Sequence, residues 1–267
     1  MLSTALLLVS AVVRSGDAVP IHYTADGKGE PALVFVHCWT CDRRFWDAQM
    51  AFFSRDHRVV AMDLAGHGES GGNREDWTIE AFGDDVRAVV DALGLRRVVL
   101  VGSSMGGLVS LEAARRLGSR VVGIVPVDSL LDFEYRMKPG EVKSAIVRMQ
   151  GHYRREASRF ITQYLFSPST PPAVRRRVLE KATSAPPGPA VAMLHASWVY
   201  DPLPALAEIR APIRAINSDK YPTNLAVNRR HSPGFKARIM KGAGHYLMIE
   251  DPDRFNQLLA AVLRDLR

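Results

Sequence analysis

The sequence predicts an α/β fold, in which helices cover both faces of a mostly parallel β-sheet. Short apolar runs rich in β-branched residues alternate with segments of helical periodicity, which is the pattern of strand–helix–strand units. The strand-like runs are largely apolar throughout, as expected for a sheet that is buried on both faces. The chain has 267 residues, 47% of them hydrophobic and 24% charged, so it can form a globular domain with an insertion.

The N-terminal half supplies the first strands and helices of this pattern. Residues 5–13 are mostly apolar and favour a first strand, followed by a turn at 15–17. The alternative is a signal peptide in residues 1–11, but no Lys or Arg precedes the apolar run, and the run is too short to span a membrane. The further elements expected here are strands at 19–23, 32–37 and 58–62 and helices at 43–54 and 79–93.

The second half continues the pattern around an interruption. Between residues 130 and 205 the sequence contains helical segments separated by proline-containing breaks, and no convincing strand. We therefore expect a helical cap at 130–205, inserted into an α/β core made of residues 1–129 and 206–267. The core elements expected here are strands at 98–101, 121–127, 212–217 and 236–240 and helices at 108–117 and 252–263.

One turn of the predicted core carries a chemical signature. The strand ending at Val101 leads into Gly102-Ser103-Ser104-Met105-Gly106, a Gly-x-Ser-x-Gly sequence, and a helix follows. A tight strand-to-helix turn holds its central serine out at the edge of the sheet, and side chains in place of the two glycines would crowd that turn. The pentapeptide alone is a weak signal, but its flanking strand and helix make Ser104 the candidate nucleophile.

A serine hydroxyl needs a general base, and the base needs an acid that orients it. We expect His245 to be the base, because it follows two loop glycines between the last strand and the last helix. Asp219 follows the strand at 212–217, and Asp128 follows the strand at 121–127. We prefer Asp219 as the acid from the order of the strands, and we keep Asp128 as the alternative.

An oxyanion hole needs two N–H donors that face the developing negative charge. One donor is expected to be the backbone N–H of Met105, directly after the nucleophile. The second is expected from the loop after the strand at 32–37, where Trp39 is preferred and Cys38 is the alternate donor.

Taken together, these motifs resemble the α/β-hydrolase superfamily and, within it, the small capped serine esterases. The resemblance implies an eight-stranded, mostly parallel sheet, a helical cap after the sixth strand, a Ser-His-Asp triad, and no cofactor or metal. Haloalkane dehalogenases and epoxide hydrolases carry an aspartate where this chain has Ser104. The matching segments are His37-x-Trp39, Asp63-x-x-Gly66-His67-Gly68-x-Ser70, Gly102-x-Ser104-x-Gly106-Gly107, Asn217-Ser218-Asp219 and Gly242-x-Gly244-His245.

The function implied is hydrolysis of carboxylic esters of small to medium apolar substrates through an acyl-enzyme. Trp198, Phe133 and Tyr164, which lie in the expected cap, are candidates for the substrate pocket, although most such residues simply pack. The same triad also serves carbon–carbon bond hydrolases, lactonases and perhydrolases, so these remain alternatives. A different class of alternative is a non-enzymatic ligand receptor or signalling protein with this fold.

Two cysteines interrupt the expected pattern. Cys38 stands where the superfamily usually has a glycine, and a side chain there could crowd the oxyanion loop. Cys38 and Cys41 are too few for a disulfide framework, and the chain offers neither a thioredoxin-type setting nor further zinc ligands in the adjacent sequence. We expect two unrelated residues near a turn, with oxidation sensitivity of Cys38 as a secondary hypothesis.

The charge pattern bears on possible partners. The net charge is +7, but no Lys/Arg tract with interleaved aromatic residues occurs, so we expect no nucleic-acid partner. We expect a small-molecule ester as the partner, no stable membrane insertion, and residence in the cytoplasm. Secretion is the alternative if residues 1–11 act as a signal peptide.

Overall fold

An eight-stranded sheet with strand order β1-β2-β4-β3-β5-β6-β7-β8 forms the centre of the molecule. The structure is a computed structural model that describes residues 9–266. Strands β3 to β8 run parallel to one another, whereas β2 is antiparallel to both β1 and β4. The strands are β1 (Val9–Arg14), β2 (Pro20–Asp26), β3 (Ala32–Val36), β4 (Val59–Met62), β5 (Val98–Ser103), β6 (Val121–Val127), β7 (Arg214–Ser218) and β8 (Lys236–Met240).

The expected mostly parallel sheet is therefore confirmed. Of the strand expected at 5–13, residues 9–13 belong to β1, and residues 5–8 lie outside the described residues. The signal-peptide alternative at 1–11 also falls mainly outside them, although Val9 pairs with Ala25 of β2. The β3 and β5 strands are buried at every position, because helices cover both faces of the sheet there.

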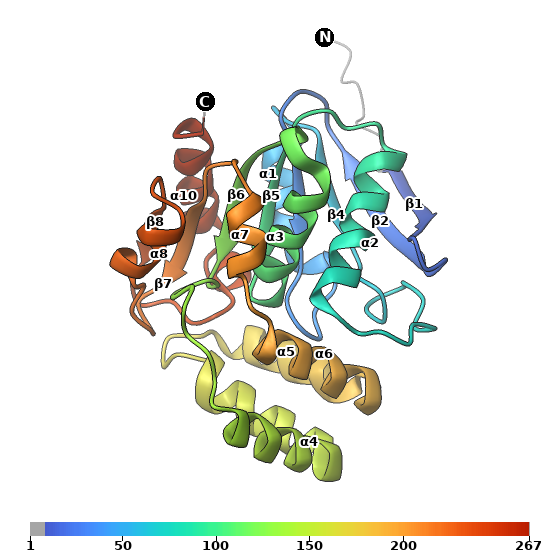
Figure 1. Cartoon of the computed structure of the whole chain (residues 1–267), viewed down its shortest axis with the longest axis vertical. Helices are drawn as coiled ribbons and strands as arrows, with labels where there is room; N and C mark the ends of the chain where they lie inside the picture. Colours follow the sequence, from blue (N-terminus) through green and yellow to red (C-terminus); the bar gives the residue numbers. More distant parts are fainter. Residues whose placement is uncertain (1–8, 267) are drawn as a thin grey trace.

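Two layers of helices enclose the sheet (Figure 1). Helices α2 and α3 pack side by side on one face, where α3 also contacts α7, and α1 and α10 pack together on the other. Thr78 is the N-cap of the amphipathic helix α2, and its side-chain oxygen accepts a hydrogen bond from the N–H of Ala81 at 3.1 Å. These core helices are α1 (Asp47–Phe53), preceded by a 3₁₀ turn, η1 (Arg43–Trp46), then α2 (Ile79–Ala92), α3 (Met105–Leu117), α7 (Leu203–Glu208), α8 (Leu225–His231), α9 (Leu247–Glu250) and α10 (Pro252–Arg264).

A second group of helices comes between β6 and β7 in the sequence. In space these helices lie together at one end of the sheet (Figure 1). Helix α4 is kinked at His152, where φ is −148° and ψ is 52°, and it continues into a π-helical turn, η3. The helical stretch from Pro139 to Leu165 is thus interrupted at His152. These elements, here called the inserted helices, are α4 (Pro139–Phe160), η3 (Ile161–Leu165), α5 (Pro172–Ser184) and α6 (Pro187–Val199).

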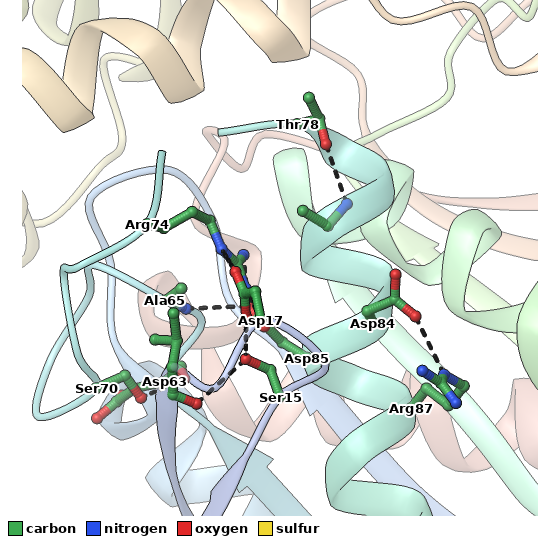
Figure 2. Close-up of polar contacts among 12 residues, drawn as sticks. Ser15, Asp17, Asp63, Ala65, Ser70, Arg74, Thr78, Asp84, Asp85 and Arg87 are labelled. Carbon is green, nitrogen blue, oxygen red and sulfur yellow. Dashed lines mark hydrogen bonds and ion pairs between the residues drawn. The ribbon is translucent and has the colours of Figure 1, made fainter. Parts of the chain in front are cut away.

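A partly buried ionic network stabilises the loop between β4 and α2. Figure 2 shows Arg74 between Asp17 and Asp85, with hydrogen bonds of 2.7 Å and 2.6 Å to their carboxylates. The hydrogen bonds from Arg74 lower the pKa of Asp17 to about 2, whereas burial raises the pKa of Asp85 to about 6. Asp85 also accepts the N–H of Ala65 at 3.1 Å, so the network joins α2 to the β1–β2 turn and to the loop after β4.

Asp63 directly follows β4 and braces the loop after it. Its carboxylate accepts the N–H groups of Arg43 and Glu69 at 2.7 Å and 2.9 Å. Ser70 donates to its backbone carbonyl at 2.7 Å, as Figure 2 shows for these two residues. Gly68 has a φ of 54° and packs against this carboxylate so closely that a Cβ would overlap it.

None of the helices within residues 9–266 combines the length and the apolar character needed to cross a membrane.

Candidate active site

Ser104 occupies a sharp turn between β5 and α3. Its φ of 53° and ψ of −118° lie in a region that non-glycine residues rarely adopt. The turn is held by a 2.9 Å bond from the Ser104 N–H to the Val127 carbonyl and by a 2.8 Å bond from Ser129 to the Ser104 carbonyl. The strained turn directs the side chain of Ser104 away from the strand and toward the end of the sheet.

The glycines flanking Ser104 allow this turn to pack closely. A Cβ on Gly102 would overlap the carbonyl of Gly106, and a Cβ on Gly106 would overlap the carbonyls of Val36 and His37. Glycine is therefore required at both positions by the approach of one backbone to another. This is the physical reason for the spacing of glycines that singled out Ser104 in the sequence.

His245 is paired with Asp128. The His245 Nδ1 and the Asp128 Oδ2 lie 2.7 Å apart, and both side chains are largely buried. The second oxygen of Asp128 accepts the N–H of Ser218 at 2.7 Å, so the carboxylate is held at both oxygens. The backbone N–H of His245 donates to the carbonyl of Leu165 in η3 at 2.9 Å. With Nδ1 directed at the carboxylate, Nε2 is the nitrogen left to act as a base.

The preference for Asp219 as the partner of His245 is wrong in this structure. Asp219 is exposed, and its carboxylate accepts the N–H of Gly242 at 2.7 Å. It lines a different cavity, together with Tyr221, Leu225 and Ile239. Asp219 thus supports the loop that carries His245, while the alternative acid, Asp128, contacts the imidazole.

The register of the strands explains why Asp128 reaches the site. Ser103 in β5 pairs with Val127 in β6, so Ser104 and Asp128 follow neighbouring strands at the same level. Asp128 has a φ of 43°, a left-handed conformation that aspartate tolerates better than most residues. Both aspartates follow strands at the same edge of the sheet, and strand order alone could not separate them.

The two expected oxyanion donors lie at the same cavity as Ser104. Met105 is the first residue of α3, so its backbone N–H has no acceptor within the helix. Trp39 follows β3, and its backbone N–H donates to none of the residues 9–266. The Trp39 indole N–H donates to the carbonyl of Ala190 in α6 at 2.8 Å, which connects this loop to the inserted helices.

A cavity of about 180 Å³ brings these groups together. Of the three aromatic residues expected to line the pocket, only Trp198 does so. Phe133 is instead fully buried against Phe235, with 5.3 Å between the ring centroids, and Tyr164 is exposed and packs on Phe160 at 5.7 Å. The lining residues are Cys38, Trp39, Ser104, Met105, Leu108, Asp128, Ser129, Phe160, Leu165, Leu194, Ser197, Trp198, His245 and Tyr246.

The sequence did not single out the other wall residues. Phe160, Leu165, Leu194 and Ser197 belong to the inserted helices, and periodicity marks a packed face without showing which residues border a cavity. Leu165 lies in the π-helical turn η3, a form of helix that is frequent at functional sites but has no clear sequence signature.

Cys38 and Cys41 are joined by a disulfide, so the expectation of two unrelated cysteines near a turn is wrong. Both residues are almost fully buried. The C-x-x-C spacing was the available signal. Cys38 is not in a left-handed conformation, and its side chain is directed into the bond with Cys41. The glycine usually found at this position is therefore not required here.

Two further buried histidines lie beneath the loop that carries Trp39. Burial lowers the pKa of His37 to about 4 and that of His67 to about 3, so both are neutral at pH 7. His67 Nε2 accepts the N–H of Thr40 at 3.2 Å, and His37 Nε2 accepts the N–H of Leu64 at 3.0 Å. These two rings support the loops, and neither lines the cavity. Within residues 9–266 no cluster of three or more His, Cys, Asp or Glu side chains is arranged to hold a metal ion.

A sequence model described as the alpha/beta hydrolase family matches residues 33–258. The chain belongs to the α/β-hydrolase family. The match covers the sheet from β3 onward, the inserted helices and the residues around Ser104, Asp128 and His245.

Known members of the family are similar to this chain to different extents. A bifunctional esterase/perhydrolase of Acinetobacter calcoaceticus is 41% identical over 97 residues, which are 36% of this chain and 35% of that relative. The matched segment thus spans about a third of that relative's length. A 3-oxoadipate enol-lactonase 2 of Acinetobacter baylyi is 24% identical over 92% of this chain and 94% of its own.

Solved structures agree on the fold. A thermophilic esterase from Thermogutta terrifontis superposes with a TM-score of 0.84 and 24% identity, covering 97% of this chain and 99% of the esterase. A bromoperoxidase from Bacillus anthracis superposes with a TM-score of 0.83 at 20% identity, covering 96% and 100%. At these identities the likeness concerns the α/β-hydrolase fold.

Proposed function

We propose that this α/β-hydrolase is a serine hydrolase of small carboxylic esters. The observation that supports this most is the 2.7 Å pair of Asp128 and His245 at the cavity that also holds Ser104. A nucleophile, a base and an orienting acid in one cavity are the groups that acyl transfer requires.

In the proposed reaction Ser104 attacks the ester carbonyl while His245 accepts the serine proton. Asp128 holds the imidazole in the Nδ1–H tautomer and stabilises its cationic form. The backbone N–H groups of Met105 and Trp39 bind the oxyanion. His245 then donates its proton to the leaving alcohol, and a water activated by the same imidazole hydrolyses the acyl-enzyme.

The size and lining of the cavity support a small apolar substrate. Its volume is about 180 Å³, and a cavity of roughly 150 Å³ is sufficient for a benzene molecule. Trp39, Phe160 and Trp198 place aromatic rings at its walls. We therefore propose short acyl or simple aryl esters as the substrate class, with the inserted helices acting as the cap over the pocket.

The decisive experiment compares Ser104→Ala with Ser103→Ala on p-nitrophenyl acetate. Ser103 is the adjacent serine, fully buried, and its hydroxyl bonds to no described residue, which makes it a matched control. We expect turnover to fall by about 10³-fold or more in Ser104→Ala, and to stay within a few-fold in Ser103→Ala. A fluorophosphonate should add one adduct to the wild type and none to Ser104→Ala. Equal turnover in both variants would contradict the proposal.

The same panel should include a lactone, and acetate with hydrogen peroxide. An enol-lactonase and an esterase/perhydrolase are among the relatives, and both reactions would use the same groups. A burst of nitrophenol followed by negligible turnover on every substrate would instead favour the ligand-receptor alternative. Residence in the cytoplasm stays a prediction from the sequence.

A further inference from the structure

In the loop after β3, two hydrogen bonds to the Cys38 carbonyl fix the orientation of the peptide group between Cys38 and Trp39. The carbonyl of Cys38 accepts a hydrogen bond from His37 Nδ1 at 2.8 Å and another from the N–H of Cys41 at 3.1 Å. His37 Nε2 accepts the N–H of Leu64, so the proton of this buried neutral ring is on Nδ1. Two donors therefore hold the Cys38 carbonyl on the side of the loop that faces His37.

This orientation determines where the next N–H points. In a trans peptide the C=O and the following N–H point in opposite directions, and the bond between Cys38 and Trp39 is trans. The N–H of Trp39 is therefore turned away from His37 and Cys41. Both Cys38 and Trp39 line the cavity that contains Ser104, so this N–H is available to an oxyanion there.

A disulfide spans the same turn. It links Cys38 to Cys41, the two residues whose backbones are already joined by the 3.1 Å hydrogen bond. Between them Thr40 has a φ of 59°, which is unusual for a β-branched residue. Such a conformation persists only where its surroundings impose it. Three interactions surround Thr40 here: the disulfide, the hydrogen bond from the Thr40 N–H to His67, and the hydrogen bond from the Trp39 indole to the Ala190 carbonyl.

We propose that the Cys38–Cys41 disulfide positions the Trp39 N–H for oxyanion binding, and that its reduction lowers turnover. This inference rests on the proposed esterase function. The cross-link takes the place of the glycine that the family usually has at position 38. It holds a strained turn in the arrangement that presents the donor, and it does not itself touch the substrate's reacting atoms.

The redox step involves two electrons and two protons. A dithiol such as dithiothreitol attacks one sulfur, the Cys38–Cys41 bond breaks, and a mixed disulfide forms. The second thiol of the reagent then displaces the protein sulfur, which leaves two cysteine thiols and a cyclic disulfide of the reagent. Of the two cysteines, Cys38 is the one that borders the cavity.

The test measures kcat and KM for p-nitrophenyl acetate before and after treatment with dithiothreitol. Alkylation and intact mass should count no free thiol before treatment and two after it. We expect kcat to fall about tenfold on reduction with KM within twofold, because reduction loosens the oxyanion donor without removing it, and that donor acts in the transition state. Reoxidation should restore kcat.

Two variants separate this effect from a general loss of structure. Cys38→Gly/Cys41→Ser has no reducible bond, so dithiothreitol should leave its kcat unchanged, and Cys41→Ser should show the low kcat without treatment. Thermal unfolding of each form reports whether it is folded. An unchanged kcat with two thiols counted would overturn the inference, as would two free thiols in the untreated protein. Neither outcome would affect the Ser104→Ala result, on which the esterase function depends.

Discussion

The two sides of the cavity are built in different ways. On the strand side, each group of the proposed triad follows the end of a parallel strand, and hydrogen bonds from His245 and Ser218 hold the Asp128 carboxylate. On the side of the inserted helices, the wall consists mainly of apolar side chains, such as Leu194 and Trp198, that fill space. The arrangement on the strand side therefore depends on the identity of single hydrogen-bonding atoms, whereas the shape of the wall on the helix side depends on side-chain volume.

This difference predicts two kinds of response to mutation. Replacing one oxygen by nitrogen on the strand side should abolish the chemistry while leaving the shape unchanged. Removing several methyl groups from the helix side should leave the chemistry intact and change which substrate fits. Three experiments test this contrast, in order of decreasing effect.

The largest effect is expected from Asp128→Asn. The amide cannot stabilise the imidazolium of His245 and favours the wrong tautomer, so kcat for p-nitrophenyl acetate should fall about 10³- to 10⁴-fold. Asp219→Asn is the matched control, because within residues 9–266 the Asp219 carboxylate hydrogen-bonds only to the backbone N–H of Gly242. It should retain activity within about fivefold. A larger loss in Asp219→Asn than in Asp128→Asn would show that the pairing in the structure is not the one used in catalysis.

The pH dependence of stability should be controlled by buried histidines on the strand side. His37 and His67 bind protons far more weakly when folded, at a pKa of about 4 and about 3, than when unfolded. Unfolding therefore takes up protons below about pH 6.5, and this makes the folded state less stable as the pH falls. Asp85, with a pKa raised to about 6, acts in the opposite direction between about pH 4 and 6. Two histidines outweigh one aspartate.

We expect the free energy of unfolding to fall by about 2 to 3 kcal/mol between pH 6 and pH 4, as measured by urea titration. His67→Gln should nearly remove this slope. His195→Gln, an exposed position on α6, should leave the slope as it is in the wild type. A slope that is equally steep in both variants would mean that His67 is not the group that titrates.

The smallest effect is expected on the helix side. Leu194→Ala in α6 enlarges the cavity, so kcat/KM for a hexanoyl ester relative to an acetyl ester should rise about tenfold, with kcat for the acetyl ester within a few-fold of the wild type. Val178→Ala in α5 removes a buried side chain that does not border the cavity, and it should leave this ratio unchanged. A loss of turnover without a change in the ratio would contradict the division between the two sides.

Prediction from the sequence succeeded for more residues on the strand side of the cavity than on the side of the inserted helices. Ser104 and its glycines were predicted because the turn imposes a local requirement that is visible in five adjacent residues. The central strands β3 and β5 were predicted because burial on both faces demands apolar, β-branched runs. The wall residues Phe160, Leu165 and Leu194 were not predicted, since a helix that faces a cavity and a helix that faces a core have the same periodicity.

Some errors arose from contacts that the sequence does not encode locally. Asp128 and Asp219 both follow strands at the same edge of the sheet, and only the positions of their backbones decide which carboxylate reaches His245. Phe133 and Tyr164 were expected at the pocket, but one lies in the core and the other at the surface. Cys38 and Cys41 have a spacing that permits several outcomes, and the turn around Thr40 brings them into bonding distance.

The sequence by itself determined the α/β class, the strand-to-helix turn that carries Ser104 and the loop that carries His245. These features depend on local sterics and on hydrophobic periodicity, which neighbouring residues specify. The tertiary structure alone decided the acid partner, the walls of the cavity and the cross-link beside Trp39. Each of these requires residues distant in sequence, or a particular turn geometry, to meet within a few ångströms, and only the packing of the strands and the inserted helices specifies that.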